Sequence, residues 1–201
     1  MIAAIVLAAG RATRFGSPKQ LAEVGGRTLV QHAVDAAADA GVDVVVVVLG
    51  HAADRVEREL SLPRNARVVL NPAFAEGQST SLRAGIGGLP PEAGAAVILL
   101  ADQPGITALD VQAVIATHTA TGARIVRARY RGIPGHPVLI AKELFPEVEG
   151  TTGDAGARDV LRDHADEIVE VDIDRDPPPD VDTPDDLMVA RRDVSRPDNS
   201  G

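Results

Sequence analysis

The stretch Ile2-Ala-Ala-Ile-Val-Leu-Ala8 is a continuous run of apolar residues that leads into Ala9 and Gly10. Such a run is typical of a strand that is buried on both faces of a parallel sheet. Two further runs, Val42–Leu49 and Ala95–Ala101, have the same character. Between the first two, apolar residues from Leu29 to Ala37 recur at helical spacing. These runs therefore predict parallel strands with helices between them.

The rest of the chain continues this alternation. Right-handed strand–helix–strand crossovers place helices on both faces of a sheet, so the pattern predicts an α/β fold, a three-layer α/β/α sandwich with a mostly parallel sheet. The further predicted helices are Ala52–Leu60, Ser79–Gly88 with Ser79 as its N-cap, Leu109–His118, Ala157–His164 and Pro184–Arg191. The further predicted strands are Arg67–Leu70, Arg124–Ala128, Val138–Ile140 and Ile168–Val171, and Arg11–Gly26 and Asn71–Gln78 are predicted loops.

Composition narrows the functional classes. The chain has 201 residues, of which 45% are hydrophobic, so we expect one domain over residues 1–192, with residues 193–201 as a disordered tail. A net charge of −9 and only four aromatic residues (three Phe and one Tyr) argue against binding to nucleic acid. Without cysteine there is no disulfide or thiolate site. Apolar runs shorter than the ~20 residues of a membrane span predict a cytoplasmic protein without membrane contact.

The loop after the first strand is suited to phosphate. Small residues at Ala8, Ala9 and Gly10 allow a ligand to approach backbone amides, and Arg14 and Lys19 add positive charge for a polyphosphate. The spacing is neither that of a Walker A loop nor G-x-G-x-x-G. The alternative is a glycine-rich surface turn with solvated basic residues.

Four polar clusters are expected to share one cleft. They follow Ala8, Leu70 and Leu100, and the fourth surrounds Val181. Ligands of open α/β sheets bind beyond the carboxyl ends of the strands. Asp102 directly follows one of these ends, so its carboxylate is predicted to face the ligand.

Taken together, these motifs resemble the nucleotidyltransferase family of the molybdenum cofactor, whose signature is L-A-[AG]-G-x(3)-R-[FM]-G-x(2)-K. The likeness covers nearly the whole chain and implies a Rossmann-like fold of the nucleotide-diphospho-sugar transferase kind. Leu-Ala-Ala-Gly at the start of the signature is similar to the cytidylyltransferases of the family, whereas guanylyltransferases tend to have Leu-Ala-Gly-Gly. The matching segments are Leu7–Lys19, Glu76–Gly85, Leu100–Pro104, Gly135–Pro137, Gly153–Arg158 and Asp182–Leu187.

The resemblance implies transfer of CMP from CTP to the phosphate of a molybdopterin-type cofactor, with release of pyrophosphate. It assigns Mg²⁺, with Mn²⁺ possible, to Asp102 and Asp182, and catalysis to Lys19, Arg14 and Asp102. Asp182 could instead cap the last helix, and Asp180, Asp185 and Asp186 are expected to be solvated. The implied nucleotide contacts are Leu7, Ala8, Ala9, Gly10, Arg14, Lys19, Gly77, Gln78, Ser79 and Ala101, and the implied acceptor contacts are His136, Asp154 and Arg158.

Three alternatives remain open from the sequence. The enzyme could use GTP with the same cofactor, or transfer a nucleotide to a sugar phosphate or small-alcohol phosphate. A protein of another class would carry the molybdenum cofactor without turnover. An acceptor molybdoenzyme is a further expected partner, and the acidic C-terminal segment is one place where it could dock.

Overall fold

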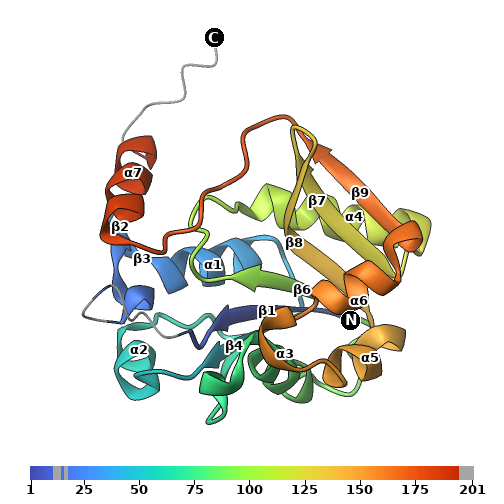
Figure 1. Cartoon of the computed structure of the whole chain (residues 1–201), viewed down its shortest axis with the longest axis horizontal. Helices are drawn as coiled ribbons and strands as arrows, with labels where there is room; N and C mark the ends of the chain where they lie inside the picture. The colour runs from blue at the N-terminus through green and yellow to red at the C-terminus, as the bar shows by residue number, and fades with distance from the viewer. Residues whose placement is uncertain (11–14, 16–17, 195–201) are drawn as a thin grey trace.

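A computed structural model describes residues 1–10, 15 and 18–194. Within them, seven strands form one sheet in the order β5-β4-β1-β6-β8-β7-β9 (Figure 1). Only β8 runs antiparallel to its neighbours, so the predicted α/β fold with a mostly parallel sheet is confirmed. The strands are β1 (Ile2–Ala8), β4 (Val44–Leu49), β5 (Ala66–Leu70), β6 (Ala95–Leu100), β7 (Ile125–Tyr130), β8 (Ile133–Ala141) and β9 (Ile168–Ile173).

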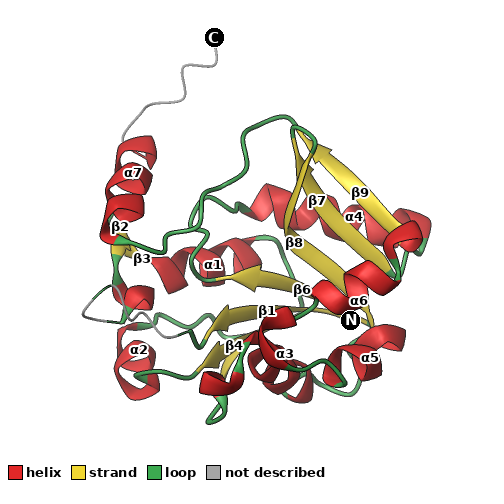
Figure 2. Ribbon diagram, in the orientation of Figure 1, coloured by secondary structure: helices red, strands yellow, loops and turns green. Residues whose placement is uncertain are grey.

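Helices cover both faces of this sheet and complete the three layers (Figure 2). One apolar core joins β1, β4 and β6 to α1 (Leu29–Asp39), α2 (Ala53–Glu59) and α4 (Ala108–Thr121). The opposite core packs α3 (Gln78–Gly87), α5 (Phe145–Glu149) and α6 (Arg158–Asp163) on the other face. The last helix, α7 (Pro184–Val194), lies on a small hairpin of β2 (Glu23–Val24) and β3 (Arg27–Thr28).

The buried strands account for this arrangement. Residues 45–49 of β4 are all Val or Leu and are fully buried, so this strand has no polar face. α4 begins with a capping box, in which Thr107 and Asp110 satisfy each other's backbone amides. No helix in the described part of the chain is long and apolar enough to cross a membrane.

Several predicted boundaries were wrong. β8 begins at Ile133, five residues before the predicted Val138, because the Pro and Gly residues of Ile133–Pro137 hide a strand that contains a bulge at His136 and Pro137, opposite Arg127 and Ala128 of β7. The predicted loop Arg11–Gly26 contains β2 and a 3₁₀ turn, Lys19–Leu21. α7 reaches Val194, so Asp193 and Val194 are helical, whereas the rest of the expected tail lies outside the described residues.

Candidate active site

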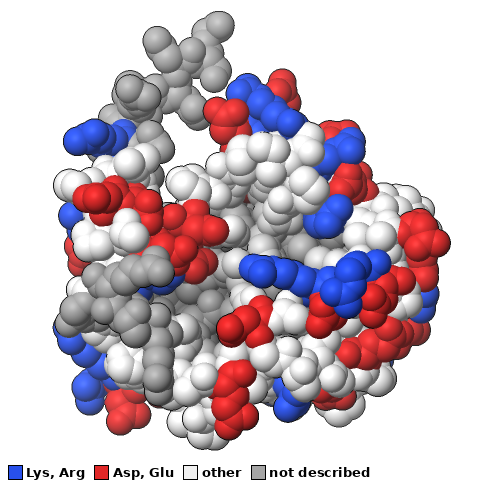
Figure 3. Space-filling model, in the orientation of Figure 1, with Lys and Arg blue, Asp and Glu red and all other residues white. Residues whose placement is uncertain are grey.

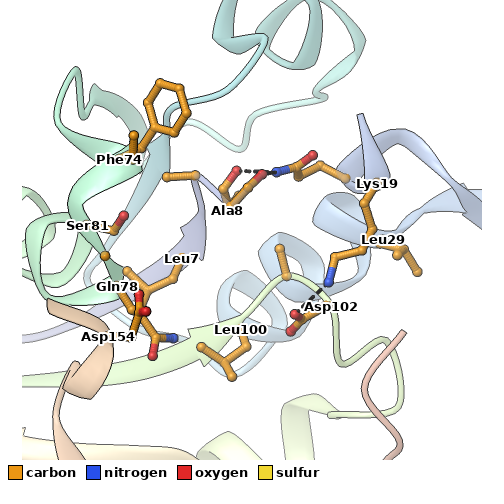
Figure 4. A pocket seen from close by; sticks show the side chains of 16 residues that line it. Leu7, Ala8, Lys19, Leu29, Phe74, Gln78, Ser81, Leu100, Asp102 and Asp154 are labelled. Carbon is orange, nitrogen blue, oxygen red and sulfur yellow. Dashed lines mark hydrogen bonds and ion pairs between the residues drawn. The ribbon is translucent and has the colours of Figure 1, made fainter. Parts of the chain in front are cut away.

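A cavity of about 340 Å³ lies at the carboxyl ends of β1 and β6 (Figure 4). We call it the principal cavity because Ala8, Gly10 and Lys19 of the predicted phosphate-binding loop line it. Segments that follow β1, β5 and β6 meet on its walls, as the rule for α/β sheets predicts. Its lining residues are Leu7, Ala8, Ala9, Gly10, Lys19, Gln20, Leu29, Phe74, Ala75, Gly77, Gln78, Ser81, Leu100, Ala101, Asp102 and Asp154.

Lys19 joins two carboxylates at one end of the cavity. Its Nζ lies 2.9 Å from Oδ2 of Asp102 and 2.7 Å from Oδ1 of Asp182. Burial by itself lowers the pKa of Lys19, but the charges and hydrogen bonds of Asp102 and Asp182 outweigh burial and raise it. The ammonium is therefore held charged between the two carboxylates.

The backbone at the end of β1 is held by Gln20, a residue that the sequence analysis missed. The Gln20 side chain is buried, and its Nε2 donates to the carbonyls of Ala8, at 2.9 Å, and Gly10, at 2.7 Å. The neighbouring Ala9 carbonyl accepts from the amide of His51 at 3.3 Å. The position next to Lys19 was the only signal in the sequence. Arg14, which was predicted to act with Lys19, lies outside the described residues.

Asp102 and Asp182 fit an oxygen-preferring divalent cation. The amide of Val181 donates to the backbone carbonyl of Asp102 at 2.9 Å, which brings the two carboxylates to the same place. Oδ1 of Asp102 is buried and has no hydrogen-bond partner in the described part of the chain. The described part of the chain contains no group of three or more His, Cys, Asp or Glu side chains that could hold a metal ion. A bound ion would therefore complete its shell with substrate phosphates and water.

The alternative that Asp182 caps α7 is not what the structure shows. Thr183 and Asp186 cap the helix together: the Thr183 hydroxyl accepts from the Asp186 amide at 3.2 Å. Oδ2 of Asp186 accepts from the Thr183 amide at 2.8 Å, from the Thr183 hydroxyl at 2.8 Å and from the Asp182 amide at 3.0 Å. The hydrogen bonds from Thr183 lower the pKa of Asp186. The expectation that Asp186 is merely solvated was wrong, and the Asp182 carboxylate is left to contact Lys19.

The loop before α3 forms the opposite wall. Gly77 adopts a φ of 118°, and a Cβ there would lie 2.3 Å from the carbonyl carbon and oxygen of Gly153. This contact sets Gln78 beside Asp154 on the cavity wall (Figure 4). Ser79 is neither the N-cap, which is Gly77, nor a wall residue, because its side chain is fully buried in the first turn of α3.

A smaller cavity of about 80 Å³ adjoins the first one. Leu7, Gln78 and Leu100 line both cavities. His136 and Arg158 line the smaller one, whereas Asp154 lines the larger, so the three predicted acceptor residues are divided between the two.

His136 is half-buried and held by two hydrogen bonds. The Tyr130 hydroxyl donates to its carbonyl at 2.7 Å, and its Nδ1 lies 3.2 Å from the Ile98 carbonyl. Burial lowers the pKa of His136, and the charge of Arg158 acts in the same direction. We expect a neutral imidazole beside Arg158, so the positive charge of the smaller cavity comes from Arg158.

Acidic and basic side chains are separated on the face of the molecule that contains the cavity. Figure 3 shows a central hollow with acidic side chains gathered on one side and basic side chains on the other. The net charge of −9 therefore does not describe the hollow itself. Basic groups at the site can attract an anionic ligand to an acidic protein.

The MobA-like NTP transferase domain matches residues 4–168. Nicotine blue oxidoreductase of Paenarthrobacter nicotinovorans is 34% identical over 80% of this chain and 81% of that protein. The bifunctional protein GlmU of Trichlorobacter lovleyi is 34% identical over 61% of this chain, which spans only 27% of GlmU.

The structural comparison covers more of the chain. The crystal structure of Rv0371c from Mycobacterium tuberculosis H37Rv has a TM-score of 0.86 and 31% identity, over 95% of this chain and 97% of that one. The complex of Rv0371c with manganese has a TM-score of 0.81 and 30% identity over the same shares. From the matching domain, the fold and these relatives, we conclude that the chain belongs to the MobA-like NTP transferase family of nucleotidyltransferases.

Proposed function

We propose that this protein transfers CMP from CTP to the phosphate of a molybdopterin-type cofactor and releases pyrophosphate. The observation that carries the proposal is the meeting of Lys19 with Asp102 and Asp182 at the cavity lined by the end of β1. Nucleotide transfer needs positive charge and a metal-binding carboxylate at one place. Lys19 would supply the charge, and Asp102 and Asp182 the carboxylates.

The nucleotide is proposed to lie along the backbone of Leu7–Gly10. A Cβ added at Gly10 would meet nothing within 4 Å, so phosphate oxygens can approach the backbone closely there. The Lys19 ammonium would turn from the carboxylates to the α-phosphate and stabilise the charge that builds on it. Arg14 is proposed to hold the departing β- and γ-phosphates, a role inferred from the family motif.

Asp102 and Asp182 would hold Mg²⁺, or Mn²⁺ in its place. The ion would neutralise charge on the phosphate oxygens. The unpartnered Oδ1 of Asp102 supports this assignment, because a buried carboxylate oxygen without a hydrogen bond is costly unless a ligand fills its coordination. The manganese complex of the relative Rv0371c supports a divalent cation in general.

The acceptor phosphate is proposed to enter beside His136 and Arg158, with Asp154 on the nucleotide side. One of its oxygens forms a bond to the α-phosphorus, and the bond from that phosphorus to the bridging oxygen breaks, so the β- and γ-phosphates leave as pyrophosphate. The attacking phosphate is already ionised near neutral pH. The protein therefore needs to align and neutralise two anions rather than remove a proton.

CTP is the proposed nucleotide because the signature has Ala9 where guanylyltransferases tend to have glycine. Ala9 and Phe74 both line the cavity. Both also pack on Gly50, where a Cβ would lie 2.9 Å from Cβ of Ala9 and 2.6 Å from Cβ of Phe74. The Ala9 methyl and the Phe74 side chain thus fill space at the cavity wall. We propose that these two side chains narrow the cavity enough to favour a pyrimidine over the larger purine.

The proposed reaction has consequences for the setting of the protein. We propose residues 1–192 as one transferase domain, in keeping with a family match that runs over residues 4–168. A cytoplasmic location would supply the nucleotide and Mg²⁺. A molybdoenzyme that accepts the finished cofactor is the proposed macromolecular partner.

The test is pyrophosphate release by the purified full chain with the cofactor, Mg²⁺ and each of CTP, GTP, ATP and UTP. We expect release with CTP and a product whose mass equals the cofactor plus CMP less one water. Asp102→Asn should abolish release, whereas Asp166→Asn, which removes an exposed carboxylate from the turn before β9, should not.

Each negative result corrects a different part of the proposal. Release with GTP alone would show that the base is wrong, and preference for a sugar phosphate would show that the acceptor is wrong. No release with any nucleotide and acceptor would contradict transferase activity. Tight cofactor binding without turnover would instead favour a carrier.

The relative named nicotine blue oxidoreductase favours a second candidate, an oxidoreductase. For this candidate we propose that the cavity would bind a nicotinamide dinucleotide as the reductant. This candidate predicts oxidation of the reduced dinucleotide by a small aromatic acceptor, seen as loss of absorbance. No change in absorbance together with CTP-dependent pyrophosphate release would reject it.

A further inference from the structure

The connection between β9 and α7, residues 174–183, runs alongside the segment that follows β6, residues 102–105. The Val181 amide donates to the Asp102 carbonyl at 2.9 Å. The next residue after Asp102 is Gln103, and the residue before Val181 is Asp180. Nε2 of Gln103 donates to Oδ1 of Asp180 at 2.6 Å. The two segments therefore lie in opposite directions with a defined register.

The register continues beyond this pair. A Cβ on Gly105 would lie 2.9 Å from Cβ of Pro178, so the backbones approach closely there. Nη2 of Arg175 donates to the Gly105 carbonyl at 3.1 Å and forms an ion pair with the buried Asp110. The far end of the connection is thus anchored to the start of α4.

Asp182 depends on this register for its position. Its side chain is 56% exposed, and the contact described for its carboxylate is the one with Lys19. An exposed aspartate does not hold itself in one place, because side-chain entropy and water both oppose a single geometry. The backbone of the connection must therefore bring Asp182 to Asp102.

The Gln103 side chain ties this connection to the segment that carries Asp102. It does not line the principal cavity, and its Oε1 is buried without a hydrogen-bond partner in the described part of the chain. Its described hydrogen bond is the one that Nε2 makes to Asp180, two residues before Asp182. Asp180, expected from the sequence to be solvated, accepts this bond.

We propose that Gln103 and Asp180 are positioning residues that hold Asp182 in register with Asp102 and thereby set the affinity of the site for a divalent cation. The inference rests on the proposed function, which assigns the ion to these two carboxylates. Ligand-orienting partners of this kind commonly change metal affinity by about 10–100-fold when they are mutated.

The test uses the full chain with a non-hydrolysable CTP analogue, and Mn²⁺ binding is measured by electron paramagnetic resonance. In Gln103→Glu a carboxylate faces Asp180 and repels it, so we expect about tenfold weaker Mn²⁺ binding or more. Weaker binding would be informative, because an added negative charge that left the geometry of the site intact would strengthen Mn²⁺ binding. The double variant Gln103→Glu with Asp180→Asn restores a donor and an acceptor at the same net charge, and we expect affinity close to wild type.

Gln112→Glu is the matched control, since it adds the same charge on α4, where the Gln112 amide bonds the Asp39 carbonyl. It should leave Mn²⁺ binding unchanged. Thermal unfolding of every variant separates displacement of Asp182 from loss of fold. We also expect the Mg²⁺ concentration for half-maximal pyrophosphate release to rise in Gln103→Glu and return in the double variant.

Wild-type affinity in Gln103→Glu, or no recovery in the double variant, would overturn the positioning role. Failure of the proposed function appears elsewhere, as absence of pyrophosphate release by the wild-type protein. The Mn²⁺ measurements on the wild type and on Asp182→Asn show separately whether Asp182 binds the ion.

Discussion

The Lys19 ammonium occupies the place between Asp102 and Asp182 where we propose that a divalent cation binds. With Nζ 2.9 Å from Asp102 and 2.7 Å from Asp182, the ammonium offsets one of their two negative charges. A divalent ion that binds the same oxygens must compete with it. A nucleotide whose phosphate attracts Lys19 would remove that competition.

Lys19→Met tests this competition. Without nucleotide, we expect the variant to bind Mn²⁺ about tenfold more tightly than the wild type, because the competing charge is gone. Turnover should fall by about 10²-fold or more, because a group that stabilises the transition-state charge is lost. Mn²⁺ titration and pyrophosphate release measure the two effects.

Lys142→Met is the control, because the Lys142 ammonium donates to the Pro91 carbonyl, away from the cavity. It should change neither quantity. Weaker Mn²⁺ binding in Lys19→Met than in the wild type would show that Lys19 supports the ion rather than competing with it.

Among the elements, the contact between the loop before α3 and the turn Gly153–Ala155 shapes the wall of the cavity. Gly77→Ala would place a methyl 2.3 Å from the Gly153 backbone at a φ of 118°. Strain of this kind costs about 1–3 kcal/mol, and we expect the melting temperature to fall by about 2–12 °C. Nucleotide affinity should fall as well, because Gln78 and Asp154 lie on that wall.

Gly87→Ala is the matched control at the other end of α3. A Cβ there would meet nothing within 4 Å, and alanine favours helix, so a small gain in stability is expected. Equal melting temperatures for Gly77→Ala and the wild type would show that the two loops can separate at no cost.

α5 and the turn before β9 are joined by one histidine. Nε2 of His164 lies 2.7 Å from Glu147, and Nδ1 lies 2.8 Å from Glu167. The hydrogen bond to Glu147, followed by that to Glu167, raises the pKa of His164 above its usual value of 6.5. A raised pKa means that the folded protein binds this proton more tightly than the unfolded chain does.

This contribution to stability is therefore complete below about pH 6.5 and is lost as pH rises through the raised pKa of the folded state. Burial gives His136 a lowered pKa, with the opposite sign: its contribution is lost as pH falls below 6.5. We expect His164→Gln to remove the decline in unfolding free energy above pH 6.5, as measured by urea unfolding at several pH values.

His118→Gln serves as the comparison, because the described partner of that ring is the Ala123 carbonyl. A pH profile of His164→Gln parallel to the wild type would show that the two glutamates do not stabilise the imidazolium.

At the scale of the whole molecule, a ligand that binds the folded chain alone must stabilise it. Saturation at 100 times the dissociation constant adds about 2.7 kcal/mol, or about 5–10 °C for a chain of this size. We expect the CTP analogue with Mg²⁺ to raise the melting temperature more than the analogue alone.

In Asp102→Asn the extra increment from Mg²⁺ should disappear, while part of the increment from the nucleotide remains. The amide keeps the shape of the side chain but lacks the charge that holds the ion. An undiminished Mg²⁺ increment in this variant would place the ion elsewhere.

The sequence predicted features that depend on neighbouring residues in the chain, but not contacts between residues far apart in it. Apolar runs such as Ile2–Ala8 and Val42–Leu49 identified buried strands, because burial on both faces leaves no room for polar residues. The carboxyl-end rule then placed Asp102 at the cavity, and the family motif singled out Lys19. Fold class and the centre of the site were thus encoded locally.

The tertiary structure decided what distant residues do to one another. Lys19 and Asp182 are 163 positions apart, and no spacing in the chain shows that they touch. The reversal of β8, the role of Gln20 beneath the first loop and the division of His136 and Asp154 between two cavities are decided by packing across the sheet. Local patterns encode which surfaces are buried, whereas only the folded chain determines which polar groups those buried surfaces bring together.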